Sequence, residues 1–432
     1  MSIATPFPPA LAPTAVPCAD ASACSRQSLL VRGWRLAGVS ALRATFARVL
    51  LAVALALEAG TVAAQPALTA RAWTLLDVNS GTLLASHRAD EPLEPASLAK
   101  LMTAYLVFTA LAEKRVAPND LVQVSAEAFA APGKAGSRMF IEPGKPVTLA
   151  ELVTGLAVVS GNDAAVALAE HVAGSVPAFV TRMNNEAGRL GLKGTRFANP
   201  TGLANAQQYT TAADMARLAA RLLADFPEQS KVFALKEAGY GGIVQANRNR
   251  LLWTDSSVDG LKTGHHATAG WNLIATATRP QGTGEARFPR RLIAVVLGAP
   301  SESARAQDAL ALLNHGYASF DTLLLYRRDR SLGTPEVWKG DRATVPIGFE
   351  RDVFVTVPRG ELQRLGQGAL ASQVERVDPL VAPLRAGERV GMLRVTLAGR
   401  TVSEVPIVAL ANVGPAGFFG RAYDAVRLML RN

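Results

Sequence analysis

Residues 94–103 read EPASLAKLMT, and the apolar residues that follow recur at helical spacing as far as Leu111. This pattern predicts a helix that begins at Ser97, just after Pro95. Residues three apart share one face of a helix, so the Lys100 amine is within reach of the Ser97 hydroxyl. A serine needs a base to act as a nucleophile, and a lysine serves near neutral pH only if its pKa is depressed. So short a motif also arises by chance, with the serine capping the helix and the lysine solvated.

Two further motifs follow in order along the chain. Ser160-Gly161-Asn162 lies 63 residues after Ser97, and Lys262-Thr263-Gly264 lies 102 residues further on, just before a strand. A buried hydroxyl and amide could relay a proton and hold a carbonyl, and a strand-borne lysine and hydroxyl could bind a carboxylate. Glycine permits close approach of a substrate backbone. Taken alone, the first of these motifs is better explained as a polar turn, and the second could be an ordinary strand start. The ordered set of three, however, is the signature of penicillin-interacting serine enzymes.

The apolar pattern predicts two folded parts after residue 64. Helices are expected at 97–111, 148–171, 212–223 and 304–326, and strands at 73–76, 82–84, 271–278 and 291–297. Strands at both ends with helices between them favour an α/β or α+β domain at 65–326, with one sheet and a helical lobe. Short alternating strands punctuated by proline and glycine favour a separate small β domain at 327–413, without helices, as a sandwich or barrel.

The last segment, 414–432, has the pattern of an amphipathic helix. Its apolar residues fall at 3–4 spacing: Phe418, Phe419, Ala422, Ala425, Val426, Met429 and Leu430. From Phe418 to Asn432, at ~1.5 Å per residue, such a helix is about 22 Å long, too short and too charged to cross a bilayer. We expect it to lie in a membrane surface as an anchor; the alternative is a helix docked on the β domain.

Residues 1–64 predict a cleaved secretory signal rather than a retained anchor. Five arginines precede the nine apolar residues Val49–Leu57, and small residues at 62–64 suit a signal peptidase. Nine apolar residues are too few for a span, which needs about 20. Both cysteines, Cys18 and Cys24, lie inside this segment, so the mature chain would have neither disulfides nor cysteine metal ligands.

Net charge and composition limit the classes of partner that the chain is expected to bind. Residues 1–64 hold five arginines and two acids, so their removal takes the net charge from +10 to +7. An exported, modestly basic protein suits an anionic membrane surface or wall polymers. Basic residues do not alternate with aromatics, so no nucleic-acid partner is expected. His87, His171 and His315 lie far apart, without zinc-ligand spacing, so neither a metal nor a cofactor is expected.

Beyond the three motifs, the chain resembles the low-molecular-mass penicillin-binding proteins that are serine-type D-alanyl-D-alanine carboxypeptidases. The resemblance covers essentially the whole chain after residue 64. It is carried by residues 94–103, 156–164, Asn247-Arg248-Asn249, 258–265, 269–273 and 417–420. It implies a β-lactamase-like domain (an antiparallel sheet with a helical lobe), a small β domain and a terminal helix at the periplasmic face of the inner membrane. The implied substrates are peptidoglycan peptides ending in D-Ala-D-Ala, with β-lactams as covalent inhibitors.

The resemblance also implies a role for each motif residue. Ser97 would be acylated with Lys100 as its base, Ser160 would pass a proton to the leaving D-alanine, and Asn162 would hold the peptide carbonyl and Lys100. Lys262 and Thr263 would meet the terminal carboxylate, Gly264 would admit the substrate backbone, and the backbone N–H of His265 would complete an oxyanion hole. An arginine after the next strand, aligned at Arg305, would also bind the carboxylate. His266 departs from the threonine usual in relatives.

Three other functions would share part of this sequence pattern. A class A β-lactamase would need a glutamate that activates water for deacylation, and no matching segment lies between Asn162 and Lys262. A catalytically idle scaffold that binds wall peptides is disfavoured by the intact motifs. A soluble D,D-endopeptidase would share the chemistry but normally lack the β domain and anchor.

Overall fold

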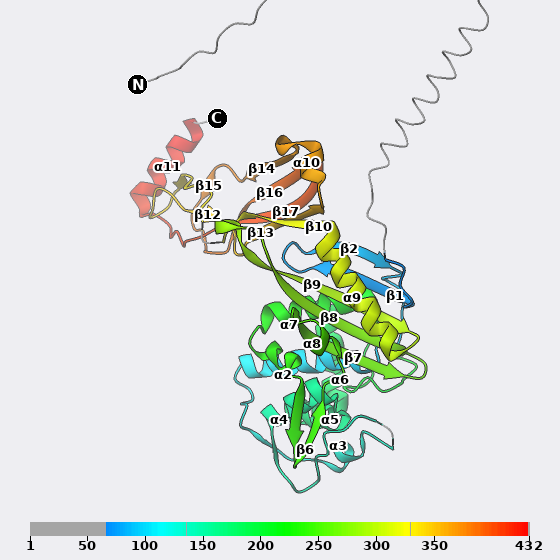
Figure 1. The fold of residues 1–432 in the computed structure, drawn as a ribbon. Coiled ribbons are helices and arrows are strands. Elements are labelled where there is room, and N and C mark those ends of the chain that lie inside the picture. Colours follow the sequence, from blue (N-terminus) through cyan, green and yellow to red (C-terminus); the bar gives the residue numbers. More distant parts are fainter. Residues whose placement is uncertain (1–65, 135, 329, 431–432) are drawn as a thin grey trace, which may run out of the picture. The chain divides into compact units, whose positions relative to one another are not determined.

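The computed structural model describes residues 66–134, 136–328 and 330–430. The predicted signal segment and both cysteines lie outside the described residues. After residue 65 the chain forms a five-stranded antiparallel sheet in the order β2-β1-β9-β8-β7 (Figure 1). Its strands are β1 (Ala72–Asp77), β2 (Thr82–His87), β7 (Val258–His266), β8 (Gly270–Gln281) and β9 (Phe288–Ala299). The expected antiparallel sheet with a helical lobe is confirmed.

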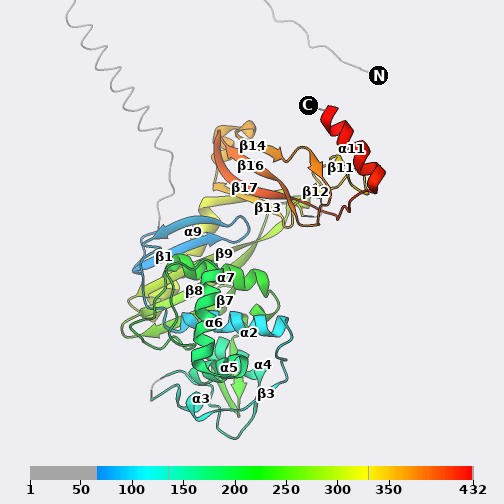
Figure 2. The same cartoon turned by 180° about the vertical axis from the view of Figure 1, so that it is seen from behind.

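Alternating residues of the central strand β9 pack on opposite faces of this sheet. Ile293, Val295 and Leu297 join the core of the helical lobe. Leu292, Ala294 and Val296 pack instead with residues of helix α9 (Glu302–Ser319). This is the two-residue period of a strand buried on both sides. Figure 1 shows α9 on one face, and Figure 2 shows the helical lobe from behind.

The helical lobe fills the chain between β2 and β7. Its main helices are α2 (Lys100–Ala112), α4 (Leu149–Thr154), α5 (Asn162–Ala173), α6 (Val176–Arg189) and α7 (Ala212–Asp225). Shorter elements are the 3₁₀ turns η1 (Ala96–Ala99) and η3 (Gln229–Ala234), the π-helical turn η2 (Gly155–Val159), α3 (Ala126–Ala130), α8 (Leu251–Thr254), and the pairs β3 (Leu121–Val122) with β4 (Val147–Thr148) and β5 (Glu237–Tyr240) with β6 (Ile243–Ala246). Almost all of α2 is buried, so it forms the centre of the lobe.

Two helix predictions were wrong in extent. The stretch 148–171 breaks at Ser160, whose φ of 64° is left-handed. The helix expected to reach Tyr326 ends at Ser319, and residues 320–326 form strand β10 (Phe320–Tyr326). The apolar run Leu323–Leu325 is too short for its periodicity to distinguish a strand from a helix.

The C-terminal part is the expected small β domain. A four-stranded sheet in the order β12-β17-β16-β14 and the pairs β10-β13 and β11-β15 enclose one core. The strands are β11 (Val337–Trp338), β12 (Ile347–Gly348), β13 (Val353–Pro358), β14 (Leu370–Arg376), β15 (Leu380–Val381), β16 (Arg389–Leu397) and β17 (Arg400–Ala409). The expectation of no helix was wrong, because α10 (Glu361–Leu365) lies here. Five residues are too few to display a helical period.

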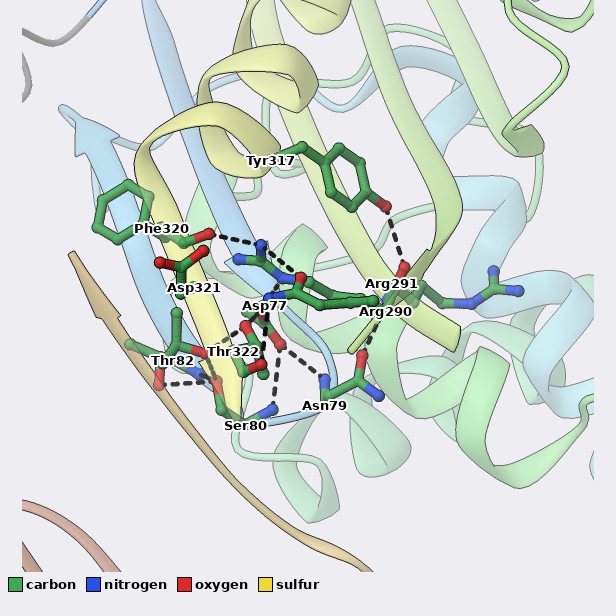
Figure 3. A network of polar contacts seen from close by, with 12 residues as sticks. Asp77, Asn79, Ser80, Thr82, Arg290, Arg291, Tyr317, Phe320, Asp321 and Thr322 are labelled. Carbon is green, nitrogen blue, oxygen red and sulfur yellow. Dashed lines mark hydrogen bonds and ion pairs between the residues drawn. The ribbon is translucent and has the colours of Figure 1, made fainter. Parts of the chain in front are cut away.

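A buried polar network joins the first sheet to this domain (Figure 3). Asp77 Oδ2 accepts hydrogen bonds from Arg290 Nε at 2.8 Å and from Thr322 Oγ1 at 2.7 Å. The Oγ1 of Thr356, on β13, lies 2.9 Å from that of Thr322 and 2.7 Å from Ser80 Oγ. The side chains of Asp77 and Arg290 are both fully buried.

The terminal helix α11 (Phe418–Leu430) contacts the β domain through its polar side. Asp424 accepts a hydrogen bond from the Lys339 N–H at 2.6 Å, and the Arg427 guanidinium lies over Trp338 at 4.7 Å. The apolar residues of α11 remain exposed, with Phe419 86% and Met429 81% accessible. In the described part of the chain no single helix is long and apolar enough to cross a membrane; the bent pair α5 and α6 passes only by length and composition.

Candidate active site

The three motifs meet at one cavity of about 640 Å³ between the helical lobe and strand β7. Seven of the predicted site residues line it: Ser97, Ser160, Asn162, Thr263, Gly264, His265 and Arg305. The other two, Lys100 and Lys262, are buried beside it, with 0% and 2% exposure. The structure therefore brings together residues that are more than 200 positions apart in the sequence.

Ser97 lies in the turn η1 rather than in α2 itself. The residue before it, Ala96, has a left-handed φ of 48°, which a non-glycine residue adopts only under tertiary constraint. Two glycines allow the surrounding backbone to approach this turn. A Cβ at Gly202 would lie 1.9 Å from the Ala96 carbonyl oxygen, and one at Gly264 would lie 3.0 Å from the Ser97 nitrogen. The turn that carries Ser97 is thus tightly enclosed by backbone.

The Lys100 amine is held beside the Ser97 hydroxyl. Its Nζ lies 3.0 Å from Ser97 Oγ, 2.7 Å from Asn162 Oδ1 and 2.5 Å from the Thr201 carbonyl oxygen. Burial, together with the positive charge of Arg248, lowers the pKa of Lys100 from 10.5 to about 7. A large fraction of the amine is therefore neutral near neutral pH and able to accept a proton.

The π-helical turn η2 and helix α5 position the second motif. Ser160 ends η2 in the left-handed conformation, and its buried Oγ has no hydrogen-bond partner among the described residues. Asp163 receives the backbone N–H groups of Met139 and Phe140 at 2.9 and 3.0 Å. These bonds fix the segment 137–140, and its Ser137 carbonyl accepts the Asn162 N–H at 2.9 Å, which holds the start of α5 in place.

The third motif lies within β7, which passes next to the turn that carries Ser97. The amine of Lys262 contacts the Thr263 carbonyl at 3.1 Å. Burial, and then the charges of Lys100, Arg248 and Arg305, lower its pKa well below the usual range. The strand is tied to the turn through Asn272 on β8, whose Nδ2 donates to the Glu94 and Pro95 carbonyls. These bonds therefore fix the position of the third motif relative to Ser97.

The far end of the cavity is cationic. Arg305 is 3% exposed; its Nη2 donates to the Arg248 carbonyl and to Glu302 Oε1, both at 3.2 Å. Its guanidinium lies over Trp271 at 4.9 Å, and Trp271 stacks on His265 at 3.7 Å. Arg248 and Arg305 thus form a positive surface suited to a carboxylate.

His266, the residue that departs from the usual pattern, lies at the rim of this cavity. Its Nε2 is 3.1 Å from Glu94 Oε2, and its Nδ1 accepts the Ala269 N–H at 3.2 Å. The ring therefore braces the β7–β8 turn against the segment before Ser97.

Three contributors were missed from the sequence. Arg248 was seen only as part of a shared segment, Trp271 had no assigned role, and the Thr201 carbonyl contact with Lys100 was not foreseen. A lone arginine or a backbone carbonyl carries no periodic signal, and only the fold shows where it points. Among residues 66–430, the unplaced positions aside, no three His, Cys, Asp or Glu side chains cluster in a way that suits a metal ion.

Comparison with known proteins agrees with this geometry. Residues 59–301 match the D-alanyl-D-alanine carboxypeptidase family, and residues 320–415 match the penicillin-binding protein 5 C-terminal domain. The D-alanyl-D-alanine carboxypeptidase DacC of Escherichia coli K12 is 41% identical over 408 residues, covering 94% of this chain and 97% of that protein.

Solved structures of similar proteins have the same fold. Penicillin-binding protein 5 from Haemophilus influenzae is 37% identical, with a TM-score of 0.71 over 81% of this chain and 99% of that one. Penicillin-binding protein 6B from Escherichia coli is 34% identical, with a TM-score of 0.63 over 80% of this chain and 96% of that one. The chain therefore belongs to the D-alanyl-D-alanine carboxypeptidase family of penicillin-binding proteins.

Proposed function

We propose that Ser97 is the nucleophile of a serine-type carboxypeptidase that removes the terminal D-alanine from peptidoglycan peptides. The neutral Lys100 amine takes the proton of the Ser97 hydroxyl while Oγ attacks the carbonyl carbon of the penultimate D-alanine. The C–N bond then breaks, and the departing amine receives a proton through Ser160. Water hydrolyses the acyl-Ser97 ester and completes the cycle. A β-lactam carbonyl acylates the same oxygen, and slow hydrolysis makes the drug an inhibitor.

The remaining residues of the site would stabilise the charge of the substrate and hold it in position. The backbone N–H groups of Ser97 and His265 would stabilise the developing oxyanion. Asn162 holds Lys100 and is available to the peptide carbonyl. Thr263, Arg305 and Arg248 would bind the terminal carboxylate, whose charge would favour the protonated form of the nearby Lys262.

The observation that carries this proposal is the buried Lys100 amine, 3.0 Å from Ser97 Oγ and with its pKa lowered to about 7. The test is D-alanine release from a pentapeptide by the full chain and by Ser97→Ala, with Ser372→Ala on the β domain as a matched control. We expect release to vanish only in Ser97→Ala. Release that persists in that variant would reject Ser97 as the nucleophile.

The alternatives are not favoured. The one glutamate that lines the cavity, among the residues described, is Glu302, and it is engaged by Arg305 at 3.2 Å. It is therefore poorly suited to activate a deacylating water as in class A β-lactamases. Rapid nitrocefin turnover would nevertheless favour a lactamase. Binding of a pentapeptide without D-alanine release would favour an idle scaffold.

We further propose that the enzyme is exported, loses residues 1–64, and acts at the periplasmic face of the inner membrane. Under this proposal 65–326 is the catalytic domain, 327–413 the β domain and 414–432 the anchor. Support for the anchor comes from the exposed apolar residues of α11, since exposed apolar surface of this kind marks an interaction site. Contact of its polar side with the β domain would leave that apolar surface free to enter the lipid headgroups.

A further inference from the structure

His266 ends strand β7 at the rim of the catalytic cavity, directly after the residue whose backbone N–H the proposed reaction uses. Neighbouring side chains of a strand point to opposite faces. The ring of His265 stacks on Trp271 across the hairpin at 3.7 Å. The ring of His266 instead faces Glu94, three residues before Ser97.

Both ring nitrogens of His266 are engaged by the protein. Nδ1 lies 3.2 Å from the backbone nitrogen of Ala269, whose N–H it accepts. An accepting nitrogen carries no proton, so the proton of the neutral ring is on Nε2. That nitrogen lies 3.1 Å from Glu94 Oε2 and donates to the carboxylate. The ring therefore offers no free donor to a substrate carboxylate, and what it does is connect two parts of the protein.

Glu94 is held to the β7–β8 hairpin through both its side chain and its backbone. The Thr268 hydroxyl oxygen lies 3.0 Å from Glu94 Oε2 and 3.1 Å from His266 Nδ1, which adds a second link between the carboxylate and the ring. The Glu94 carbonyl accepts Asn272 Nδ2 at 3.0 Å. Between Glu94 and Ser97 the chain is short and passes through the left-handed residue that precedes the serine. The position of Glu94 therefore constrains that of the Ser97 backbone.

This brace joins the two segments that carry the backbone N–H groups of the proposed oxyanion hole. The N–H of Ser97 follows Glu94, and that of His265 directly precedes His266. The two segments also touch, because a Cβ at Gly264 would lie 3.0 Å from the Ser97 nitrogen. We propose that His266 is a positioning residue, which through Glu94 sets the separation of these two N–H groups. This inference rests on the proposed function and adds a residue to the same site.

Two other roles for the ring predict different kinetics. A ring that bound the substrate carboxylate would affect KM, and a ring that only supported the fold would affect the melting temperature. An oxyanion hole acts on a charge that exists only in the transition state, so its displacement lowers kcat. Acylation and hydrolysis of the ester both pass through such an oxyanion, so both steps slow together and KM stays nearly unchanged.

The experiment measures kcat and KM for D-alanine release from a pentapeptide by the full chain, below the melting transition of every variant. His266→Ala should lower kcat by about 10- to 100-fold, the cost of displacing a group by about 1 Å. Its KM should stay within about twofold of that of the unmodified chain. His87→Ala, at an exposed histidine that ends β2 and does not line the cavity, is the matched control and should retain kcat.

Two amide variants separate the two ends of the ring. The amide of glutamine reaches the position of Nε2 and can donate to Glu94, whereas that of asparagine reaches only the position of Nδ1. His266→Gln should therefore recover most of the rate that His266→Ala loses, and His266→Asn should not. This pair keeps the test valid even where the alanine variant does not fold.

Glu94→Ala should lower kcat as His266→Ala does. The double variant should be no slower than either single variant, because both changes remove one shared interaction. An unchanged kcat in His266→Ala, a loss confined to KM, recovery in His266→Asn but not in His266→Gln, or additive losses in the double variant would overturn the positioning role. Absence of D-alanine release by the unmodified chain would instead contradict the proposed function.

Discussion

The ε-amino nitrogen of Lys100 lies 3.0 Å from Ser97 Oγ and is fully enclosed by protein. Because its pKa is about 7, the amine changes protonation in the physiological range. Only the neutral amine accepts the serine proton, so acylation should rise with pH through about 7 and level off above it. Below pH 6 the rate should fall about tenfold per pH unit. The second-order rate of penicillin acylation from pH 5 to 9 measures this; a flat profile would exclude Lys100 as the base.

Arg248 should set the position of that profile. Its charge is one cause of the low pKa of Lys100, so Arg248→Gln should raise this pKa and move the midpoint to higher pH. Arg248→Lys keeps the charge and should leave the midpoint near that of the unmodified protein. Arg287→Gln, at an exposed position away from the cavity, controls for the overall charge. An unchanged midpoint in Arg248→Gln would remove the electrostatic role assigned here.

Trp271 should act through Arg305. The indole supports the guanidinium at 4.9 Å, and loss of such a contact costs about 0.5–2 kcal/mol. We expect Trp271→Leu to raise KM for D-Ala-D-Ala peptides by about 3- to 30-fold, and Trp271→Tyr to restore it. A peptide that ends in a carboxamide lacks the charge that Arg305 would bind, so its rate should change little. Equal losses for both peptides would mean that Trp271 only supports the fold.

Asp77 should contribute strongly to stability and little to chemistry. Asp77→Ala leaves the buried Arg290 guanidinium without its carboxylate partner (Figure 3), which costs about 3–5 kcal/mol. The free energy of unfolding in urea measures this cost. Asp321→Ala removes a more exposed ion pair with Arg359 and should cost less than about 1 kcal/mol. Similar costs for the two variants would show that the buried network does not stabilise the fold.

The apolar residues of α11 should mediate membrane binding. Phe419→Glu with Met429→Glu should abolish co-sedimentation with anionic phospholipid vesicles, because both side chains are largely exposed. Deletion of 415–432 should move the protein from the membrane to the soluble fraction. Asp424→Ala, on the side that contacts the β domain, serves as the control and should keep vesicle binding. Unchanged binding in the double variant would leave α11 as a docked helix.

The sequence was sufficient to predict that the three motifs form the site, because each motif is short, local and made of residues with distinctive chemistry. It also predicted most strands of the first sheet, whose apolar runs are bounded by clear turns. It failed at 320–326, where the short apolar run Leu323–Leu325 fits a strand as well as a helix. It also failed at α10, which is too short to show a period.

The site's electrostatics could not be predicted in the same way. The low pKa of Lys100 depends on burial and on Arg248, which is 148 positions away in the chain. The stack of Arg305 on Trp271 depends on how α9 crosses the end of β8. Such contacts are set by tertiary packing and leave no pattern in a single sequence.

The central claim is that Ser97 forms the acyl-enzyme. Incubation of the full chain with benzylpenicillin, followed by intact mass measurement and peptide mapping, tests it most directly. We predict one covalent penicilloyl group per chain, located on the peptide that contains Ser97 and absent from Ser97→Ala. An adduct on another residue, or one that persists in Ser97→Ala, would contradict this account.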